Sequence, residues 1–176
     1  LECAMGGEEE GGEGDANKCT EKERSGLTAA IFDEKIFVIG GYEGTTVEVF
    51  DGTKWEPLSE DFPQAVYGAA AASYMGELWV LGGFSYDEFL SNAVVWDGKI
   101  WAQGARMAQR RAWTAAAVFP SCEPDEDGRS RCTDRLYVVG GSDKRSGGLA
   151  EVESFDGRTR TWRPEAAMLN GRNRLG

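Results

Sequence analysis

Short apolar runs recur along this chain, and each run is bounded by residues typical of turns. Three runs end in a glycine pair, at Gly40-Gly41, Gly82-Gly83 and Gly140-Gly141. After a stretch of variable length, a second apolar run ends in Asp-Gly, with the aspartates at Asp51, Asp97 and Asp156. A tryptophan comes next, at Trp55, Trp101 and Trp162. A pattern written three times in one order predicts units that stack on each other, because no single unit buries its own apolar face.

Each unit predicts four short strands, so the expected fold class is all-β. The first strand is small and apolar, the next two are rich in β-branched and aromatic residues, and the fourth carries the tryptophan. The first strands are expected at 28–32, 68–73 and 114–119, the second at 35–39, 77–81 and 135–139, and the third at 46–50, 93–96 and 151–155. Asp-Gly before the fourth strand is a strong hairpin signal, because it supplies positive φ and a side-chain acceptor.

The glycine pairs and the tryptophans recur at fixed places, which favours structural roles for both. Two residues without a Cβ atom allow positive φ and a close backbone approach where the second strand leaves its sheet. Tryptophans at one recurring position are expected to pack between adjacent units rather than to stack on a ligand.

The order of these parts resembles the kelch repeat, over about residues 24 to 176. A methionine and then an arginine close the repeat, at Met107 and Arg110 and again at Met168 and Arg172. The middle boundary departs from this pattern, with Asp61 and Gln64 in those places.

The resemblance implies a kelch-type β-propeller built from four-stranded antiparallel blades. Aligned at their first residues, the units run over 24–63, 64–109 and 110–171, and a fourth begins at 172. Propellers carry about four to eight blades, so three blades are expected to form an incomplete ring. We expect the chain to be a fragment of a longer protein. The alternative, if the chain is complete, is a homodimer in which two chains share one ring.

Residues 1–23 differ from the rest and are expected to be a disordered acidic leader or linker, because glycine and glutamate dominate them. They hold more than half of the net charge of −11. Nucleic acid is not an expected partner, because a basic surface is lacking. A membrane is not expected either, since no long apolar run is present.

Cys122 and Cys132 flank an insertion between the first two strands of the third unit. These strands are antiparallel neighbours, so the two thiols either form a disulfide or stay reduced. A disulfide would indicate a secreted or lumenal protein. No secretory signal is visible, which favours the cytoplasm. Zinc is not expected, because the cysteine spacing lacks CxxC and the chain has no histidine.

The absence of histidine excludes Ser-His-Asp and Cys-His catalysis and histidine metal sites within this chain. No other catalytic constellation is marked out, so we expect no cofactor, no metal and no enzymatic activity. Resemblance to kelch-type sugar isomerases implies one alternative. The chain would then be part of a propeller enzyme acting on a carbohydrate, with its site mostly outside this segment.

Binding is the stronger hypothesis. The connections between second and third strands vary in length, and loops on a rigid scaffold usually carry function. Aromatic and basic side chains in them are typical anchors of protein interfaces. The candidate residues are Tyr42, Phe84, Tyr86, Phe89, Lys144 and Arg145. Kelch proteins include interaction scaffolds and substrate receptors of ubiquitin ligases, so the resemblance implies a protein partner. The insertion at 120–134, on the opposite face, is a second candidate surface.

Overall fold

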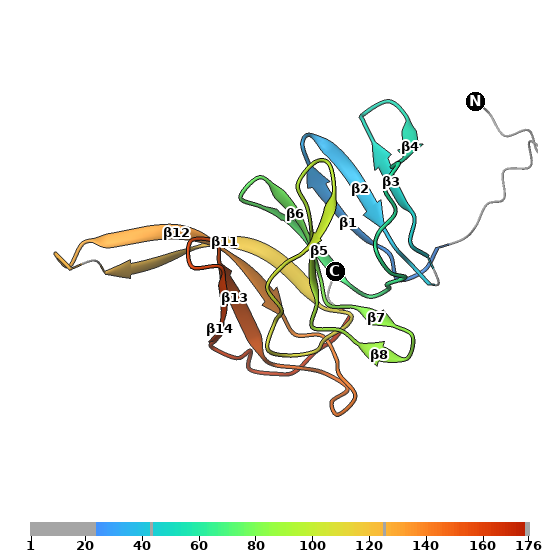
Figure 1. Ribbon diagram of the computed structural model, residues 1–176. Coiled ribbons are helices and arrows are strands. Elements are labelled where there is room, and N and C mark those ends of the chain that lie inside the picture. The colour runs from blue at the N-terminus through green and yellow to red at the C-terminus, as the bar shows by residue number, and fades with distance from the viewer. Residues whose placement is uncertain (1–23, 43, 125, 175–176) are drawn as a thin grey trace, which may run out of the picture.

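The computed structural model describes residues 24–42, 44–124 and 126–174, and the leader expected over 1–23 lies outside them. These residues form strands and no helix, and most of the strands belong to three four-stranded antiparallel sheets arranged like a fan (Figure 1). Blade 1 comprises β1 (Thr28–Phe32), β2 (Lys35–Ile39), β3 (Val47–Phe50) and β4 (Trp55–Pro57). Blade 2 comprises β5 (Ala70–Tyr74), β6 (Glu77–Leu81), β9 (Ala93–Trp96) and β10 (Trp101–Gln103). Blade 3 comprises β11 (Ala115–Pro124), β12 (Ser130–Val139), β13 (Val152–Asp156) and β14 (Thr161–Glu165).

The all-β, four-stranded prediction is confirmed, and the described residues do not close a ring. Within each blade the strands pair in chain order, from an inner first strand to an outer fourth strand. The inner strands β1, β5 and β11 contact one another in sequence around the centre of the fan. No helix among these residues has the length and apolar character needed to span a membrane.

The insertion at 120–134 differs from the expected loop. Strand pairing continues without a break from Ala115↔Val139 to Pro124↔Ser130, so the insertion is an extension of the β11–β12 hairpin. Figure 1 shows this hairpin reaching well beyond the body of the blades. The physical reason is that the ladder satisfies backbone N–H and C=O groups which an open loop would leave to solvent.

Two apolar clusters hold the blades together, one in each gap. The cluster between blades 1 and 2 includes Phe37 and Ile39 of blade 1 and Leu78 and Val80 of blade 2. Between blades 2 and 3, the opposite face of β6 packs through Trp79 against the third blade. Because β6 and β9 alternate their side chains between the two gaps, the middle of blade 2 is apolar on both faces.

The glycine pairs lie where the backbone that connects two blades crosses the end of a second strand. Gly41 N–H donates to Val66 O at 2.9 Å, and Gly83 N–H donates to Arg111 O at 2.8 Å. A Cβ atom added at Gly40 would lie 2.3 Å from the Val66 carbonyl oxygen. Only glycine leaves room for this crossing.

These hydrogen bonds give the true register of the repeats. Gly141 N–H donates to Arg172 O just as Gly83 donates to Arg111, so Arg24, Val66, Arg111 and Arg172 occupy equivalent places. The unit start expected at Gln64 is therefore two residues too early, because Val66 holds that place. The start expected at Arg110 is one residue too early, because Arg111 holds that place. The sequence alignment matched residue letters, whereas the fold matches backbone hydrogen bonds.

A ladder of backbone hydrogen bonds runs from blade to blade near the centre of the fan. Gly68 N–H donates to Gly26 O at 2.7 Å, Trp113 to Gly68 at 2.5 Å, and Arg174 to Trp113 at 2.9 Å. All four residues have positive φ. Consecutive blades are thus joined by main-chain bonds in addition to the apolar clusters.

Candidate partner-binding face

The connections between second and third strands share one face with the connections between blades. Tyr42 N–H donates to Ser25 O at 2.9 Å, and Phe84 and Tyr67 exchange a pair of backbone hydrogen bonds. Ala112 and Ser142 make the same exchange in the third blade. We call this surface the loop face. It is made by residues 40–42, 44–46, 82–92 and 140–151 with the blade connections beside them.

All six candidate residues lie on the loop face, around two pockets. The first, here called the aromatic pocket, is lined by Tyr42, Ala65, Tyr67, Phe84, Ser85, Tyr86 and Asp87. The second, here called the basic pocket, is lined by Phe89, Ala108, Gln109, Arg110, Asp143, Lys144 and Arg145. Three candidates therefore line each pocket.

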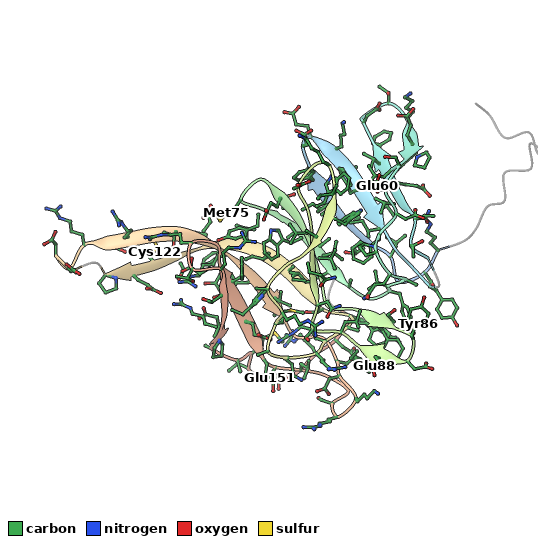
Figure 2. All side chains as sticks on the ribbon, in the orientation of Figure 1. Glu60, Met75, Tyr86, Glu88, Cys122 and Glu151 are labelled. Carbon is green, nitrogen blue, oxygen red and sulfur yellow. A yellow bond between two sulfur atoms is a disulfide. The ribbon has the colours of Figure 1, made fainter. Side chains whose placement is uncertain are left out.

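A small hairpin, which sequence reasoning did not predict, forms the wall between the pockets. It consists of β7 (Phe84–Ser85) and β8 (Glu88–Phe89). Its two turn residues, Tyr86 and Asp87, have φ of 45° and 63°, as the tight two-residue turns of β-hairpins require. Tyr86 projects from the edge of the molecule and is 85% exposed (Figure 2).

Aromatic rings connect the pockets beneath this hairpin. The ring centroids of Phe84 and Phe89 lie 4.9 Å apart, edge to face, and both rings lie about 6 Å from Trp113. Tyr67 packs 5.3 Å from Phe84 and 5.5 Å from Tyr42. Contacts of this kind favour defined ring orientations, so the two pockets share a rigid aromatic floor.

The aromatic pocket is acidic in character. Asp87 is the only charged residue among the described residues that line it. Burial raises the pKa of Tyr67, and nearby Tyr42 and Asp87 raise it further. Ser85 is buried, and its Oγ has no hydrogen-bond partner among the described residues.

The basic pocket has the opposite character. Lys144 and Arg145 are exposed, and no ion pair within the described residues holds either side chain. The carboxylate of Asp143 accepts hydrogen bonds from Ser146 N–H at 2.7 Å, Arg145 N–H at 2.8 Å and Gln109 Nε2 at 2.7 Å. The one acid in this lining is thus occupied in holding the loop.

The tryptophans of the repeat occupy two kinds of environment. Trp101 donates its indole N–H to Glu60 O at 3.2 Å, and Trp162 donates to Ala105 O at 2.7 Å, so each reaches the connection that precedes its own blade. Trp55 instead packs on Phe50 of its own blade and is 50% exposed. The residue equivalent to Glu60 and Ala105 in front of blade 1 lies outside the described residues.

The Asp-Gly aspartates each cap a turn. Asp51 accepts from the N–H groups of Thr53 and Lys54, and Asp97 from those of Lys99 and Ile100. Hydrogen bonds from the Thr53 hydroxyl and then from the N–H groups of Lys54 and Thr53 lower the pKa of Asp51 to about 2. The N–H groups of Ile100 and Lys99 likewise lower the pKa of Asp97.

Asp156 caps the corresponding turn of blade 3. Burial alone would raise its pKa, but the N–H groups of Arg158 and Thr159 and the guanidinium of Arg135 lower it on balance. Arg135 Nη2 lies 3.0 Å from Asp156 Oδ2.

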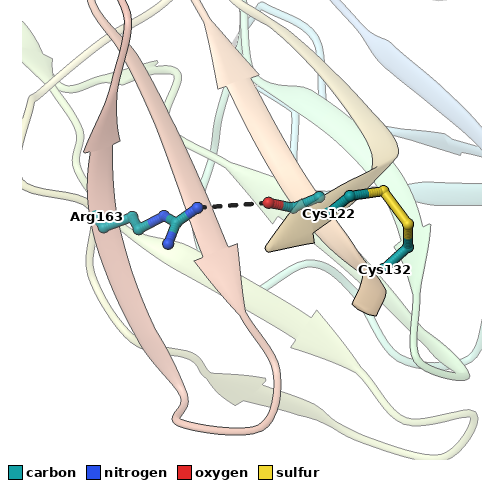
Figure 3. The surroundings of a disulfide bond; sticks show 4 residues. Cys122, Cys132 and Arg163 are labelled. Carbon is teal, nitrogen blue, oxygen red and sulfur yellow. Dashed lines mark hydrogen bonds between the residues drawn. A yellow bond between two sulfur atoms is a disulfide. The ribbon is translucent and has the colours of Figure 1, made fainter. Parts of the chain in front are cut away.

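On the opposite face, the β11–β12 arm carries a disulfide between Cys122 and Cys132, which lie directly opposite each other in the ladder. Figure 3 shows Arg163 of β14 beside it, donating from Nη2 to Ser121 Oγ at 3.4 Å. Arg163 Nη1 also lies 2.6 Å from Glu123 Oε1. The base of the arm is therefore attached to the outer strand of blade 3.

Sequence reasoning missed the floor of the loop face. Neither Tyr67 nor Trp113 was among the candidate residues, although they directly precede the first strands expected at 68–73 and 114–119. The strands begin at Ala70 and Ala115, which leaves both aromatic rings in the blade connections. The signal that could have found them is a large aromatic residue just ahead of the alanine-rich first strands of blades 2 and 3.

No group of His, Cys, Asp or Glu able to hold a metal ion occurs in residues 24–42, 44–124 and 126–174. The expected lack of a cofactor and of enzymatic activity is untested by this and stays a prediction, as does the carbohydrate-enzyme alternative.

Comparisons with known proteins fit this architecture. The Kelch motif matches residues 23–60, which include the four strands of blade 1, and residues 132–169, which include most of β12 and all of β13 and β14. A solved structure titled "Structure of YjhT" superposes with a TM-score of 0.65 at 17% sequence identity, over 85% of this chain and 54% of that chain. The chain thus spans about half the length of that protein. No curated protein sequence matches. The chain therefore carries the Kelch motif twice, and its described residues form three four-stranded blades with the fold of a kelch-type β-propeller.

Proposed function

We propose that this chain is a protein-interaction scaffold that binds a partner through the loop face. One observation carries the proposal: six residues chosen from three separate loops line two neighbouring pockets with a common floor. Rigid aromatic side chains beside arginine and lysine are typical of the residues that dominate binding energy at protein interfaces.

The scaffold beneath the loop face supports this function. The loops are attached to blades whose cores are buried and whose connections are cross-linked by backbone hydrogen bonds. A surface fixed before binding loses little conformational entropy when the partner docks. The same face would serve a substrate-recognition module within a larger assembly.

The disulfide bears on where the scaffold acts. Disulfides persist in oxidising compartments and are rare in the cytosol. The Cys122–Cys132 pairing therefore supports a secreted or lumenal location in preference to the cytoplasm. Thiol labelling of the protein in intact cells would test this, because a labelled Cys122 in the native protein would contradict it.

The test of the scaffold function uses Tyr86→Ala with Met75→Ala as its matched control. Both residues lie in two-residue hairpin turns with positive φ, and both are exposed, but they lie on opposite sides of the molecule (Figure 2). Partners captured from cells that express the protein would be quantified by mass spectrometry for the wild type and both variants. We expect Tyr86→Ala to lose partners that Met75→Ala retains. Loss with Met75→Ala alone would overturn the proposal.

A further inference from the structure

We propose that the loop face recognises a partner segment of defined polarity. This partner segment carries a basic side chain that enters the aromatic pocket and an acidic side chain that enters the basic pocket. This inference rests on the proposed scaffold function and adds the chemistry of its partner.

The aromatic pocket has the composition of a site for a cation. Tyr42, Tyr67, Phe84 and Tyr86 line it together with the carboxylate of Asp87, and no basic residue lines it in the part of the chain that the structure describes. The face of an aromatic ring attracts Arg, Lys and other cations. A carboxylate at the same mouth adds direct charge attraction and excludes acidic side chains.

Ser85 gives independent support for a polar ligand here. It lines the aromatic pocket and is only 6% exposed, yet its Oγ has no hydrogen-bond partner in the part of the chain described. Buried side-chain hydroxyls nearly always have a partner. A guanidinium or ammonium group of the bound segment would supply the missing donor.

The hairpin turn at the mouth of the pocket has a defined backbone conformation. Tyr86 adopts a left-handed conformation that bulky residues rarely adopt, and Asp87 follows it in the same region. The turn fixes Asp87 beside the aromatic rings.

The basic pocket supplies the complementary charge. Lys144 and Arg145 are exposed without ion-pair partners among the described residues, and the carboxylate of Asp143 is occupied by its own loop. Arg110 is paired with Glu88 at 3.0 Å, and both side chains are exposed. Lys144 and Arg145 are therefore the cations available to an incoming carboxylate, and an arginine can bind it through two parallel hydrogen bonds.

The two pockets carry opposite charge and lie on either side of the hairpin that contains Phe84 and Phe89. They therefore fix the direction in which a segment binds across both. A segment with the reversed order of charges would place like charges together in both pockets, which disfavours binding. The net charge of −11 on the whole chain further favours partners that are basic overall.

A random peptide library displayed on phage tests the inference with the full chain as bait. We expect wild-type protein to enrich peptides that carry an Arg or Lys at a fixed spacing from a Glu or Asp. Asp87→Asn should remove the selection for the basic residue, and the double variant Lys144→Glu/Arg145→Glu should reverse the selection at the acidic position. Met75→Ala, on the opposite side, should give the wild-type pattern.

The consensus peptide is then synthesised, and its affinity is measured by fluorescence anisotropy. Asp87→Asn should weaken binding about fivefold, the size of one exposed cation contact. A peptide with the two charges exchanged should not bind.

The outcomes separate the two proposals. If no peptide is enriched by the wild type, the scaffold function itself is contradicted. If peptides are enriched without the charge pattern, or if Asp87→Asn leaves the pattern unchanged, the scaffold function stands and the inferred partner chemistry is wrong.

Discussion

Arg111 and Glu153 form an ion pair of 2.8 Å inside blade 3, with side-chain exposures of 0% and 6%. Arg111 also donates from Nη1 to Gly140 O at 2.8 Å. Glu153 accepts from Ala108 N–H at 2.7 Å and Gln109 N–H at 3.1 Å. This pair attaches the connection between blades 2 and 3 to the third strand of blade 3.

Glu153→Ala should strongly destabilise the protein. It leaves the guanidinium of Arg111 buried without a counter-charge, which typically costs about 3–5 kcal/mol. The matched control is Glu48→Ala, because Glu48 has the same ladder position in blade 1 and pairs with Arg24. That pair is exposed to solvent at 20% and 42%, so its loss should cost about 1 kcal/mol or less. Urea unfolding measures both, and equal losses would contradict the interpretation.

In blade 2, the positions equivalent to Arg111 and Glu153 are occupied by apolar residues. Val66 and Val94 replace the arginine and the glutamate there and are buried in the apolar cluster between blades 1 and 2. Pro63 stands where blade 3 has Ala108, so one N–H that Glu153 satisfies does not exist in blade 2. The double variant Arg111→Val/Glu153→Val should therefore lose less stability than Glu153→Val alone. A double variant at least as unstable as the single one would refute this.

Trp162→Phe should cost about 1–2 kcal/mol of unfolding free energy, because it removes the indole N–H bond to Ala105 O together with apolar contact. Trp55→Phe should change the unfolding free energy by about 0.5 kcal/mol or less, since Trp55 is half exposed and its indole makes no hydrogen bond within the described residues. Denaturant melts followed by circular dichroism compare the two. An equal effect would mean that the position, rather than the hydrogen bond, determines stability.

Replacing both cysteines of the arm with serine should open its tip without unfolding the blades. The Cys122–Cys132 bond lies outside both apolar clusters, so its loss affects mainly the hairpin. Trypsin should cut after Arg129 or Arg131 on the order of tenfold faster, because a closing cross-link no longer restrains the open hairpin. Cleavage after Lys99, in an exposed turn of blade 2, is the internal reference and should not change. Unchanged cleavage of the arm would show that the bond does not restrain it.

The Asp-Gly turns predict a loss of stability in acid. The pKa of Asp51 is about 2 in the folded protein and that of Asp97 is also lowered, whereas an unfolded aspartate has a pKa of about 3.9. Because the unfolded state binds the proton more readily, the stabilisation is present above about pH 4 and is lost as the pH falls toward about 2. The urea midpoint should therefore decline over this window.

The double variant Asp51→Asn/Asp97→Asn is the comparison for the acid titration. Asparagine keeps a side-chain oxygen acceptor for the turn N–H groups but does not titrate. Its urea midpoint should fall less steeply between about pH 4 and about pH 2 than that of the wild type. Parallel slopes would assign the acid sensitivity to other carboxylates.

Most of the blade structure could be predicted from the sequence, because the residues that form it repeat. The runs before Gly40, Gly82 and Gly140 are the second strands. The third strands end directly before Asp51 and Asp97 and, in blade 3, at Asp156 itself. Each prediction was supported by three copies of one pattern.

The register and the floor of the loop face could not be predicted, because they depend on crossings between distant segments. Two adjacent arginines, Arg110 and Arg111, look alike in sequence, but only Arg111 enters the buried ion pair while Arg110 faces the loop surface. Tyr67 and Trp113 become neighbours only when blades 2 and 3 dock. The arm was missed because its ladder continues through residues that are mostly exposed and carry no apolar alternation.

The tryptophan bonds also set an order of events during synthesis. Trp101 donates a hydrogen bond to the connection at Glu60, which lies 41 residues earlier in the chain. Trp162 does the same to the connection at Ala105, which lies 57 residues earlier. The N-terminal part of a chain leaves the ribosome first. Each connection therefore lacks its tryptophan hydrogen bond until the blade that follows it in sequence has been synthesised. Each blade of the nascent protein therefore becomes fully packed only after the next blade has been synthesised. A translational pause before Trp162 would leave the apolar face of blade 2 exposed to chaperones.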